Sequence, residues 1–182
     1  MSDVLSEGIS VSIRRLELGD LARLSEFAYT VSITEPLTDA GRLAVVYAQT
    51  GMWLEDAGAA AIVETSTGRM VGTSQYYRSA PCIHGLELGY IIHDPIDRGK
   101  GFAAEALRLL SDHLFANSPQ YVRQQLLIEV WNTASWKVAE RCGFLREGVL
   151  RSSGFGADPA DEFLYSRTKR DYTEQLASTN GA

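Results

Sequence analysis

Two cations and two glycines alternate in the middle of the chain, in the run Arg98-Gly99-Lys100-Gly101. Glycine at alternate positions lets successive backbone N–H groups converge where side chains would otherwise obstruct them. The run stands just before a segment with a helical apolar stripe, and the unpaired N–H groups at a helix start favour an anion. We therefore predict a phosphate site here. The simplest alternative is a strand-to-helix turn in which glycine serves only the backbone.

Two glutamates stand in segments predicted to be buried strands, Glu87 in the first and Glu129 in the second. Burial raises the pKa of a carboxylate, and such a carboxylate can take a proton from an amine as a general base. Two other interpretations remain open for each residue, namely an exposed strand carboxylate and a member of a structural ion pair.

A polar pair, Asn132 and Ser135, follows the second glutamate and precedes an apolar helical pattern that ends at Cys142-Gly143-Phe144. Both residue types are good helix N-caps, and Thr133 between them is a further candidate, so capping alone would explain them. The Cys142 thiol is predicted to be buried and structural, because it lies in the apolar pattern.

The elements that must position these residues follow from hydrophobic periodicity. Alternation from Gly85 to His93 predicts a strand with Leu86, Leu88, Tyr90 and Ile92 on one side and Glu87, Gly89, Ile91 and His93 on the other. The apolar stripe of Ala103, Ala106, Leu107, Leu110 and Leu114 predicts a helix that begins near Gly101 or Phe102. A strand at 125–130 can then run parallel to the first through a right-handed crossover. The other predicted elements are strands at 9–13, 59–64, 70–77, 144–151 and 161–169, helices at about 21–28, 38–55 and after Asn132, and a frayed tail after about Tyr172.

Two kinds of phosphate site fit the glycine run. Gly99-x-Gly101-x-x-Ala104 satisfies a dinucleotide fingerprint, which should follow the first strand of its unit and be answered by an acidic residue about 20 residues on. The turn lies in the middle of the chain instead, and the stretch from Ser118 to Arg123 contains no Asp or Glu. The dinucleotide interpretation is therefore the weaker one.

The other interpretation rests on Arg98-x-x-Gly101-x-Ala103, which resembles the [Gln/Arg]-x-x-Gly-x-[Gly/Ala] motif of the GNAT superfamily of acyl-CoA-dependent N-acyltransferases. The run from Asn132 to Gly148 is similar to the Asn-x-x-Ser and Cys-Gly-Phe…Glu-Gly pattern of its RimJ/RimL-like branch. The resemblance covers roughly 85–169. It implies an α+β GNAT fold with a mixed, mostly antiparallel sheet, one parallel and splayed strand pair, and flanking helices, as a single domain over 1–182.

The resemblance also implies roles for particular residues. Coenzyme A would be held by Arg98, Gly99, Lys100, Gly101, Phe102, Ala103 and Ala104 at its pyrophosphate, by the backbone of Ile91, Ile92 and His93 along its pantetheine arm, and by Asn132 at a pantetheine amide. Many relatives place a helix tyrosine seven residues beyond the Asn132 position, where this chain has Ala139. Ser135 would assist the leaving thiolate instead. Glu87 is preferred over Glu129 as general base, because the Gly89-Tyr90 pattern beside Glu87 matches the branch more closely and the short loop before Asn132 leaves the register of Glu129 open.

In this family the early helices form part of the acceptor wall, so Tyr29, Glu35 and Trp53 are substrate-site candidates, together with Trp131 before the second motif. For the first three, the alternative interpretation is ordinary core aromatics and a solvated carboxylate.

The composition limits the classes of function. With 182 residues, 45% apolar residues and a net charge of −6, the sequence predicts a soluble protein and disfavours extended nucleic-acid binding. No apolar run is long enough to span a bilayer, and the N-terminus does not resemble a secretory signal. The two cysteines, Cys82 and Cys142, suit a reducing cytoplasm. We expect a cytoplasmic monomer or homodimer, without membrane or metal, that acetylates an amine-bearing acceptor: a protein N-terminus, a metabolite or an amine antibiotic. A coenzyme A sensor without turnover is the rival class.

Overall fold

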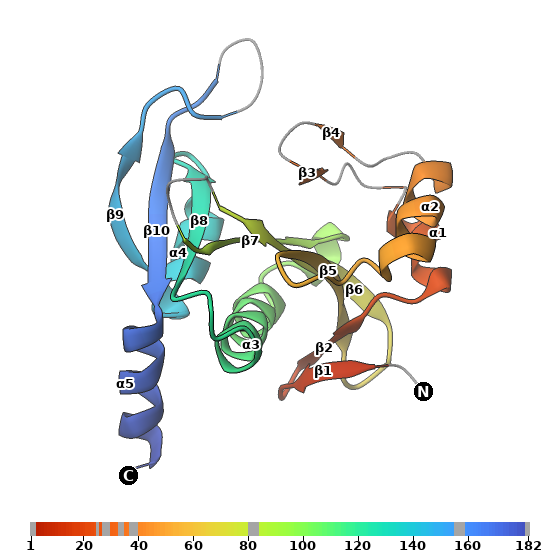
Figure 1. Cartoon of the computed structure of the whole chain (residues 1–182), viewed down its shortest axis with the longest axis horizontal. Helices are drawn as coiled ribbons and strands as arrows, with labels where there is room; N and C mark the ends of the chain where they lie inside the picture. Colours follow the sequence, from red (N-terminus) through yellow and green to blue (C-terminus); the bar gives the residue numbers. More distant parts are fainter. Residues whose placement is uncertain are drawn as a thin grey trace.

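A single large sheet organises the chain in the computed structural model, which describes residues 3–24, 26, 30–32, 35–36, 40–79, 84–154 and 159–180. Its strands run in space from β9 and β10 at one edge to β2 and β1 at the other (Figure 1). The strands are β1 (Val4–Glu7), β2 (Val11–Arg15), β5 (Ala57–Glu64), β6 (Met70–Arg78), β7 (Leu86–Ile92), β8 (Arg123–Glu129), β9 (Leu145–Leu150) and β10 (Glu162–Thr168), with a separate pair β3 (Thr30–Ser32) and β4 (Glu35–Pro36). The helices are α1 (Leu21–Leu24), α2 (Ala40–Thr50), α3 (Phe102–Asn117), α4 (Thr133–Arg141) and α5 (Lys169–Asn180), with 3₁₀ turns at Leu18–Asp20 and Pro95–Asp97.

The eight strands of the large sheet follow the order β1-β2-β5-β6-β7-β8-β10-β9 in the described residues. Neighbours are antiparallel except β7 and β8, which are parallel and pair only at Leu86 with Gln124 and at Glu87 with Gln125. Within the part of the chain that the structure describes, the edge of β7 that faces β8 therefore has no strand partner beyond Glu87. The expected α+β fold with one splayed parallel pair is confirmed.

The two faces of the sheet are covered by different helices (Figure 1). Leu86, Leu88 and Ile92 of β7 pack in one cluster with the apolar stripe of α3, as predicted from alternation. Ile91 points to the opposite face and packs against a second cluster that includes Leu24 of α1 and Leu43 of α2. Alternation along β7 therefore places Glu87 on the α1 and α2 face and Tyr90 on the α3 face.

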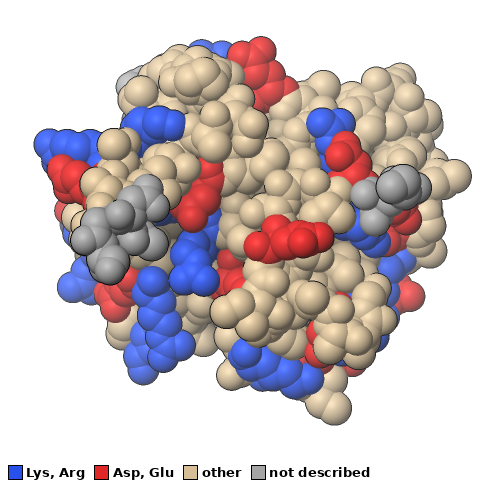
Figure 2. Space-filling model, turned by 90° about the horizontal axis from the view of Figure 1, so that it is seen from below, with Lys and Arg blue, Asp and Glu red and all other residues tan. Residues whose placement is uncertain are grey.

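Charge on the face seen from below is mixed: Lys and Arg side chains stand among Asp and Glu, with uncharged residues between them (Figure 2). The formal net charge of the whole sequence is −6. On the described part of this face, no continuous basic stripe of the kind that binds a phosphate backbone is seen (Figure 2).

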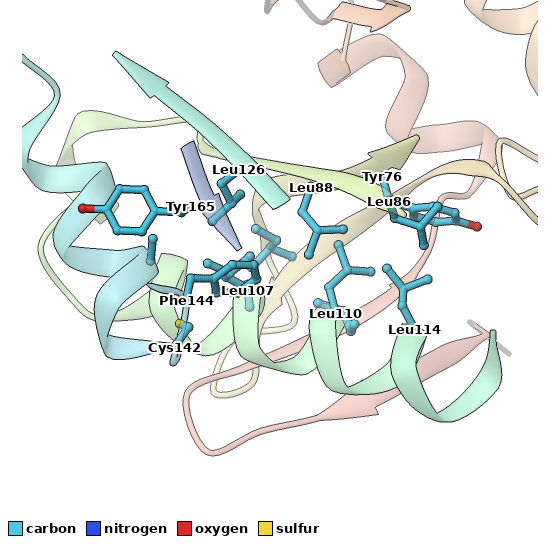
Figure 3. Packing of buried hydrophobic residues seen from close by; sticks show 14 of the residues in the cluster. Tyr76, Leu86, Leu88, Leu107, Leu110, Leu114, Leu126, Cys142, Phe144 and Tyr165 are labelled. Atoms are coloured by element: carbon cyan, nitrogen blue, oxygen red, sulfur yellow. The ribbon is translucent and has the colours of Figure 1, made fainter. Parts of the chain in front are cut away.

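The larger core cluster lies between the sheet and α3 (Figure 3). Leu107 and Leu110 are fully buried against Leu86 and Leu126. Cys142 is 5% exposed and its thiol contacts the Ala104 carbonyl at 3.1 Å, and burial raises the pKa of that thiol to about 11. The prediction of a buried structural thiol is confirmed, whereas Cys82 lies outside the described residues.

The structure differs from the sequence-based expectation near both ends. The single strand expected at 9–13 is a hairpin of β1 and β2, closed by the Gly8 N–H donating to the Val11 carbonyl at 2.9 Å. The helix expected over 38–55 spans only Ala40–Thr50, because Gly51 and Met52 adopt positive φ angles of 60° and 53°.

A frayed tail after about Tyr172 was also expected, and the chain instead forms α5 from Lys169 to Asn180. Contacts outside the helix hold it in place: Tyr172 stacks on Phe115 of α3 at 5.4 Å, Lys169 donates to the Phe115 carbonyl, and Arg167 of β10 donates to the Gln175 side chain. A pattern search along the sequence misses such a helix because its apolar residues are sparse.

Candidate active site

The glycine run forms an open backbone cradle at the start of α3. Gly99 and Gly101 have φ angles of 77° and 87°, the left-handed region that other residues rarely adopt. A Cβ placed on either glycine would meet nothing within 4 Å, so no protein group fills the space. Gly101 is the N-cap of α3 and supplies no side-chain cap. The first N–H groups of α3 thus lie beside open space, where an anion is favoured.

A buried carboxylate fixes the position of this cradle. Asp97 is 1% exposed. Its carboxylate accepts hydrogen bonds from Arg69 Nη1 at 2.7 Å, from Arg69 Nη2 at 2.9 Å and from Lys100 Nζ at 2.9 Å. These bonds hold the pKa of the Asp97 carboxyl well below its usual range. Arg98 Nε donates to the Ile92 carbonyl at 3.4 Å. Asp97 was not predicted from the sequence as part of the site. The local indication for it is its spacing of three residues from Lys100, which allows an ion pair.

A hollow of about 390 Å³ opens where β7 and β8 part. It brings together three predicted residues, Glu129, Asn132 and Ser135. It is also lined by Leu88, Gly89, Tyr90, Leu126, Leu127, Ile128, Gly154 and Glu162. The site therefore draws on β7, β8, β10, the start of α4 and the loop before β10.

Ser135 is held in this hollow by two neighbours. Asn132 is the N-cap of α4, in place of the Thr133 expected there, and its Oδ1 accepts from the Ser135 N–H at 3.2 Å. The Tyr90 hydroxyl lies 2.8 Å from Ser135 Oγ and 3.2 Å from the Ser135 carbonyl oxygen. Burial raises the pKa of Tyr90 to about 12, so the phenol stays protonated at neutral pH. Two hydroxyl groups thus stand together at the splay.

Glu87 lies on the other face of β7 and does not line the hollow. Both of its carboxylate oxygens accept hydrogen bonds: Oε1 from the Tyr77 hydroxyl of β6 at 2.5 Å, and Oε2 from Gln125 Nε2 of β8 at 3.0 Å. Burial raises the pKa of Tyr77, and the charge of Glu87 raises it further. A carboxylate with two fixed donors has a defined orientation on the α1 and α2 face.

Glu129 of β8 lies directly opposite Glu162 of β10, and both line the hollow. Burial raises the pKa of Glu162, and the negative charges of Glu87 and Glu129 raise it further, while a hydrogen bond with Ser153 lowers it. Sequence reasoning missed Glu162 because its proximity to Glu129 depends on strand register.

The four residues predicted for the acceptor site remain to be placed. Trp53 lines a different hollow, of about 630 Å³, with Tyr76 and His113, and does not line the hollow at Ser135. Trp131 follows β8 and is 67% exposed. Glu35 lies in β4, and Tyr29 lies outside the described residues.

The expected pantetheine and pyrophosphate segments are contiguous with the splay and the cradle. Ile91 and Ile92 end β7, and the buried His93 ring lies 3.3 Å from the Thr73 hydroxyl. Burial lowers the pKa of His93 to about 4, so it stays neutral. Phe102 and Ala103 begin α3 and pack on the core, with Ala104 beside them.

Comparison with known proteins identifies the class. Residues 11–145 match the family described as acetyltransferase (GNAT) domain, so the chain belongs to the GNAT acetyltransferase family. It is 33% identical over 99 residues to a ribosomal-protein-serine acetyltransferase of Escherichia coli (strain K12). That match covers 54% of this chain and 54% of the relative, so it spans about half of that protein.

Two solved structures share the fold. A dodecameric spermidine N-acetyltransferase from Vibrio cholerae has a TM-score of 0.75 and 21% identity, over 91% of this chain and 98% of that one. Mycobacterium smegmatis RimJ in complex with CoA-disulfide has a TM-score of 0.70 and 18% identity, over 98% of this chain and 92% of that one. The expected family is confirmed, and the matches to a ribosomal-protein-serine acetyltransferase and to RimJ support the expected RimJ/RimL-like branch.

Among the helices of the described residues, none combines the length and apolarity needed to cross a bilayer. The His, Cys, Asp and Glu side chains of the described residues form no group of three or more that could hold a metal ion.

Proposed function

We propose that this protein transfers the acetyl group of acetyl-CoA to a primary amine. The observation that carries the proposal is the splay of β7 and β8 after only two residue pairs, with the glycine cradle of α3 beyond it and carboxylates around it. A thioester supplies an activated acyl group whose thiol leaves easily near neutral pH. The protein then has to bind and orient the thioester, accept the proton of the amine and stabilise the charge that develops during transfer.

Binding falls to the cradle and the unpaired strand edge. The N–H groups at the start of α3 and the cations Arg98 and Lys100 would hold the pyrophosphate. The edge of β7 beyond Glu87 would pair with the pantetheine arm as a missing strand would, and its N–H groups would stabilise the developing oxyanion. Asn132 would hold a pantetheine amide near Ser135.

Proton removal from the amine falls to a carboxylate. Glu87 remains our preferred general base, because two hydrogen bonds fix its orientation on the face covered by α1 and α2. Glu129 and Glu162 line the hollow itself and would attract an ammonium group into it. Mutual repulsion between these carboxylates would be relieved by a cationic acceptor. This supports an amine over a neutral acceptor.

The acceptor we propose is a protein N-terminus, a small metabolite or an amine antibiotic. The relatives named above act, by their names, on a ribosomal-protein serine and on spermidine, and both kinds of amine belong in the first assay. We place the protein in the cytoplasm as a monomer or homodimer, where acetyl-CoA is available and where two cysteines remain reduced.

A turnover assay tests the proposal. Purified protein is incubated with acetyl-CoA and, in separate wells, spermidine, a peptide with an N-terminal serine, other small metabolites and aminoglycosides, and the CoA thiol released is measured with a thiol reagent. We expect at least one amine to raise CoA release above the amine-free rate. Acetyl-CoA binding without release in any well would favour the sensor, a candidate that stands because Ala139 occupies the position of the helix tyrosine.

A further inference from the structure

The two hydroxyl groups at the splay come from elements far apart in the sequence. Tyr90 belongs to β7 and Ser135 to the first turn of α4, and the hydroxyl oxygens are 2.8 Å apart. Both residues line the hollow between β7 and β8. A distance of 2.8 Å is the usual length of a hydroxyl–hydroxyl hydrogen bond. One hydroxyl is therefore the donor and the other the acceptor.

The lengths of the two contacts assign the direction of this bond. The Tyr90 hydroxyl can donate to the Ser135 carbonyl at 3.2 Å or to Ser135 Oγ at 2.8 Å, and the shorter contact has the usual length for an O–H donor. The Tyr90 phenol is mostly buried and remains protonated to about pH 12. The Tyr90 hydroxyl therefore donates to Ser135 Oγ, and the Ser135 hydroxyl proton is left to point into the hollow. Cooperative polarisation along two linked hydroxyls strengthens the outer hydrogen bond.

We propose that Tyr90 is a positioning residue for the transfer reaction, acting through Ser135, and that the pair takes the place of the hydroxyl missing at Ala139. This inference rests on the function proposed above. As the amine nitrogen bonds to the acyl carbon, the C–S bond breaks and its electron pair remains on sulfur. The amine proton passes to the carboxylate base and then to solvent. The Ser135 hydroxyl keeps its proton and donates a hydrogen bond to the departing thiolate, and Tyr90 holds it in that direction.

A purely structural role for Tyr90 makes a different prediction. The phenol then only ties α4 to the sheet, and any comparable tie should matter as much. The chain offers one: the fully buried Tyr165 of β10 donates to Glu140 of α4 at 3.0 Å. Tyr165→Phe is therefore a matched control, because it removes a tyrosine hydroxyl that bonds to the same helix without touching Ser135.

The test is a double-mutant cycle on kcat at saturating acetyl-CoA, with the best amine from the turnover assay. We expect Tyr90→Phe and Ser135→Ala each to lower kcat by about 10-fold or more, and the double variant to be no slower than Ser135→Ala alone. Tyr165→Phe combined with Ser135→Ala should instead multiply the two separate losses. Because the phenol does not titrate below about pH 12, Tyr90→Phe should lower the whole pH profile without moving its inflections.

The outcomes separate the two proposals. If the wild type turns over and the losses from Tyr90→Phe and Ser135→Ala multiply, the inference about Tyr90 is wrong while the proposed function stands. A loss in Tyr165→Phe that matches that of Tyr90→Phe and is equally masked by Ser135→Ala would also overturn it. If wild-type protein releases no CoA with any amine, the proposed function falls and this inference falls with it. Circular dichroism of each variant shows whether a loss reflects unfolding, and in that case Ser135→Gly, which also removes the hydroxyl, replaces Ser135→Ala in the cycle.

Discussion

Glu162 of β10 lies directly opposite Glu129 of β8, so two carboxylates share one register position at the wall of the hollow. Like charges directly opposite one another destabilise an antiparallel pair. Burial and the negative charges of Glu87 and Glu129 accordingly raise the pKa of Glu162 above its ordinary value of 4.5. The two carboxylates repel each other, and together they favour a cation bound beside them.

This relationship predicts opposite effects of Glu162→Gln on stability and on binding. Because the folded protein raises the pKa of Glu162, its contribution is most favourable below the unfolded value and is lost as the pH rises through the folded value. Removing the charge should therefore raise Tm at pH 7 by about 1–3 °C, after allowance for screening at this partly exposed group, and have no such effect near pH 4. The same variant should raise KM for a cationic amine severalfold. A lower Tm at pH 7, measured by differential scanning calorimetry, would contradict this.

Asp97→Asn should loosen the phosphate cradle. Wild-type Asp97 has a depressed pKa, so the stability it contributes is present above its ordinary value of 3.8 and is lost as the pH falls through the folded value. The variant should have a lower Tm at pH 7, and the difference should shrink in strong acid. Affinity for acetyl-CoA should fall as well, because Lys100 loses its anchor. Calorimetric titration at pH 7 measures that affinity, and an unchanged value would show that the cradle is rigid without Asp97.

Gly101→Asp should abolish most acetyl-CoA binding. It places a side chain and a negative charge in the cradle and forces a residue other than glycine to φ 87°. The matched control is Gly51→Asp, since Gly51 also has a positive φ, of 60°, and open space around a Cβ, but lies after α2. Isothermal titration of both variants with acetyl-CoA separates the local effect from backbone strain. Equal affinities would remove the cradle from the proposed binding site.

Glu87→Gln tests the choice of base. If Glu87 is the base, the variant should lose about 10²–10⁴-fold in kcat, with acetyl-CoA affinity nearly unchanged. Glu129→Gln should lose less. Tyr77→Phe should lower kcat to a smaller extent than Glu87→Gln, because it frees one oxygen of a correctly placed carboxylate. Full activity of both Gln variants across the pH range would mean that the enzyme positions an amine already deprotonated in solution.

The parts of this structure that were predictable from sequence are those in which the signal is local. The alternation of β7, the glycine turn and the stripe of α3 are contiguous, and Asn132 and Ser135 lie within one helical turn of each other. Glu162 beside Glu129, and Tyr77 and Gln125 on Glu87, depend on the register of strands joined by long connections. The pairing of Tyr90 with Ser135 depends on how α4 packs against β7, and no spacing in the sequence encodes it.

The position of Trp53 likewise depends on a feature that the local sequence pattern does not show. Trp53 was assigned to the acceptor wall on the assumption of a helix over 38–55, but α2 ends at Thr50 and a positive-φ turn carries Trp53 toward His113. Backbone reversals of this kind, made by Gly51 and Met52, cannot be read from an apolar stripe alone.

The parallel pair stops after Glu87, so the proposed pantetheine arm would extend the sheet at this edge. An extended arm that pairs with the free edge of β7 binds the folded chain and not the unfolded one, so by mass action it shifts the folding equilibrium. At a ligand concentration of about 100 times Kd this linkage adds about 2.7 kcal/mol to the free energy of unfolding. The resistance of the protein to proteolysis in the cell would then follow the supply of its acyl donor.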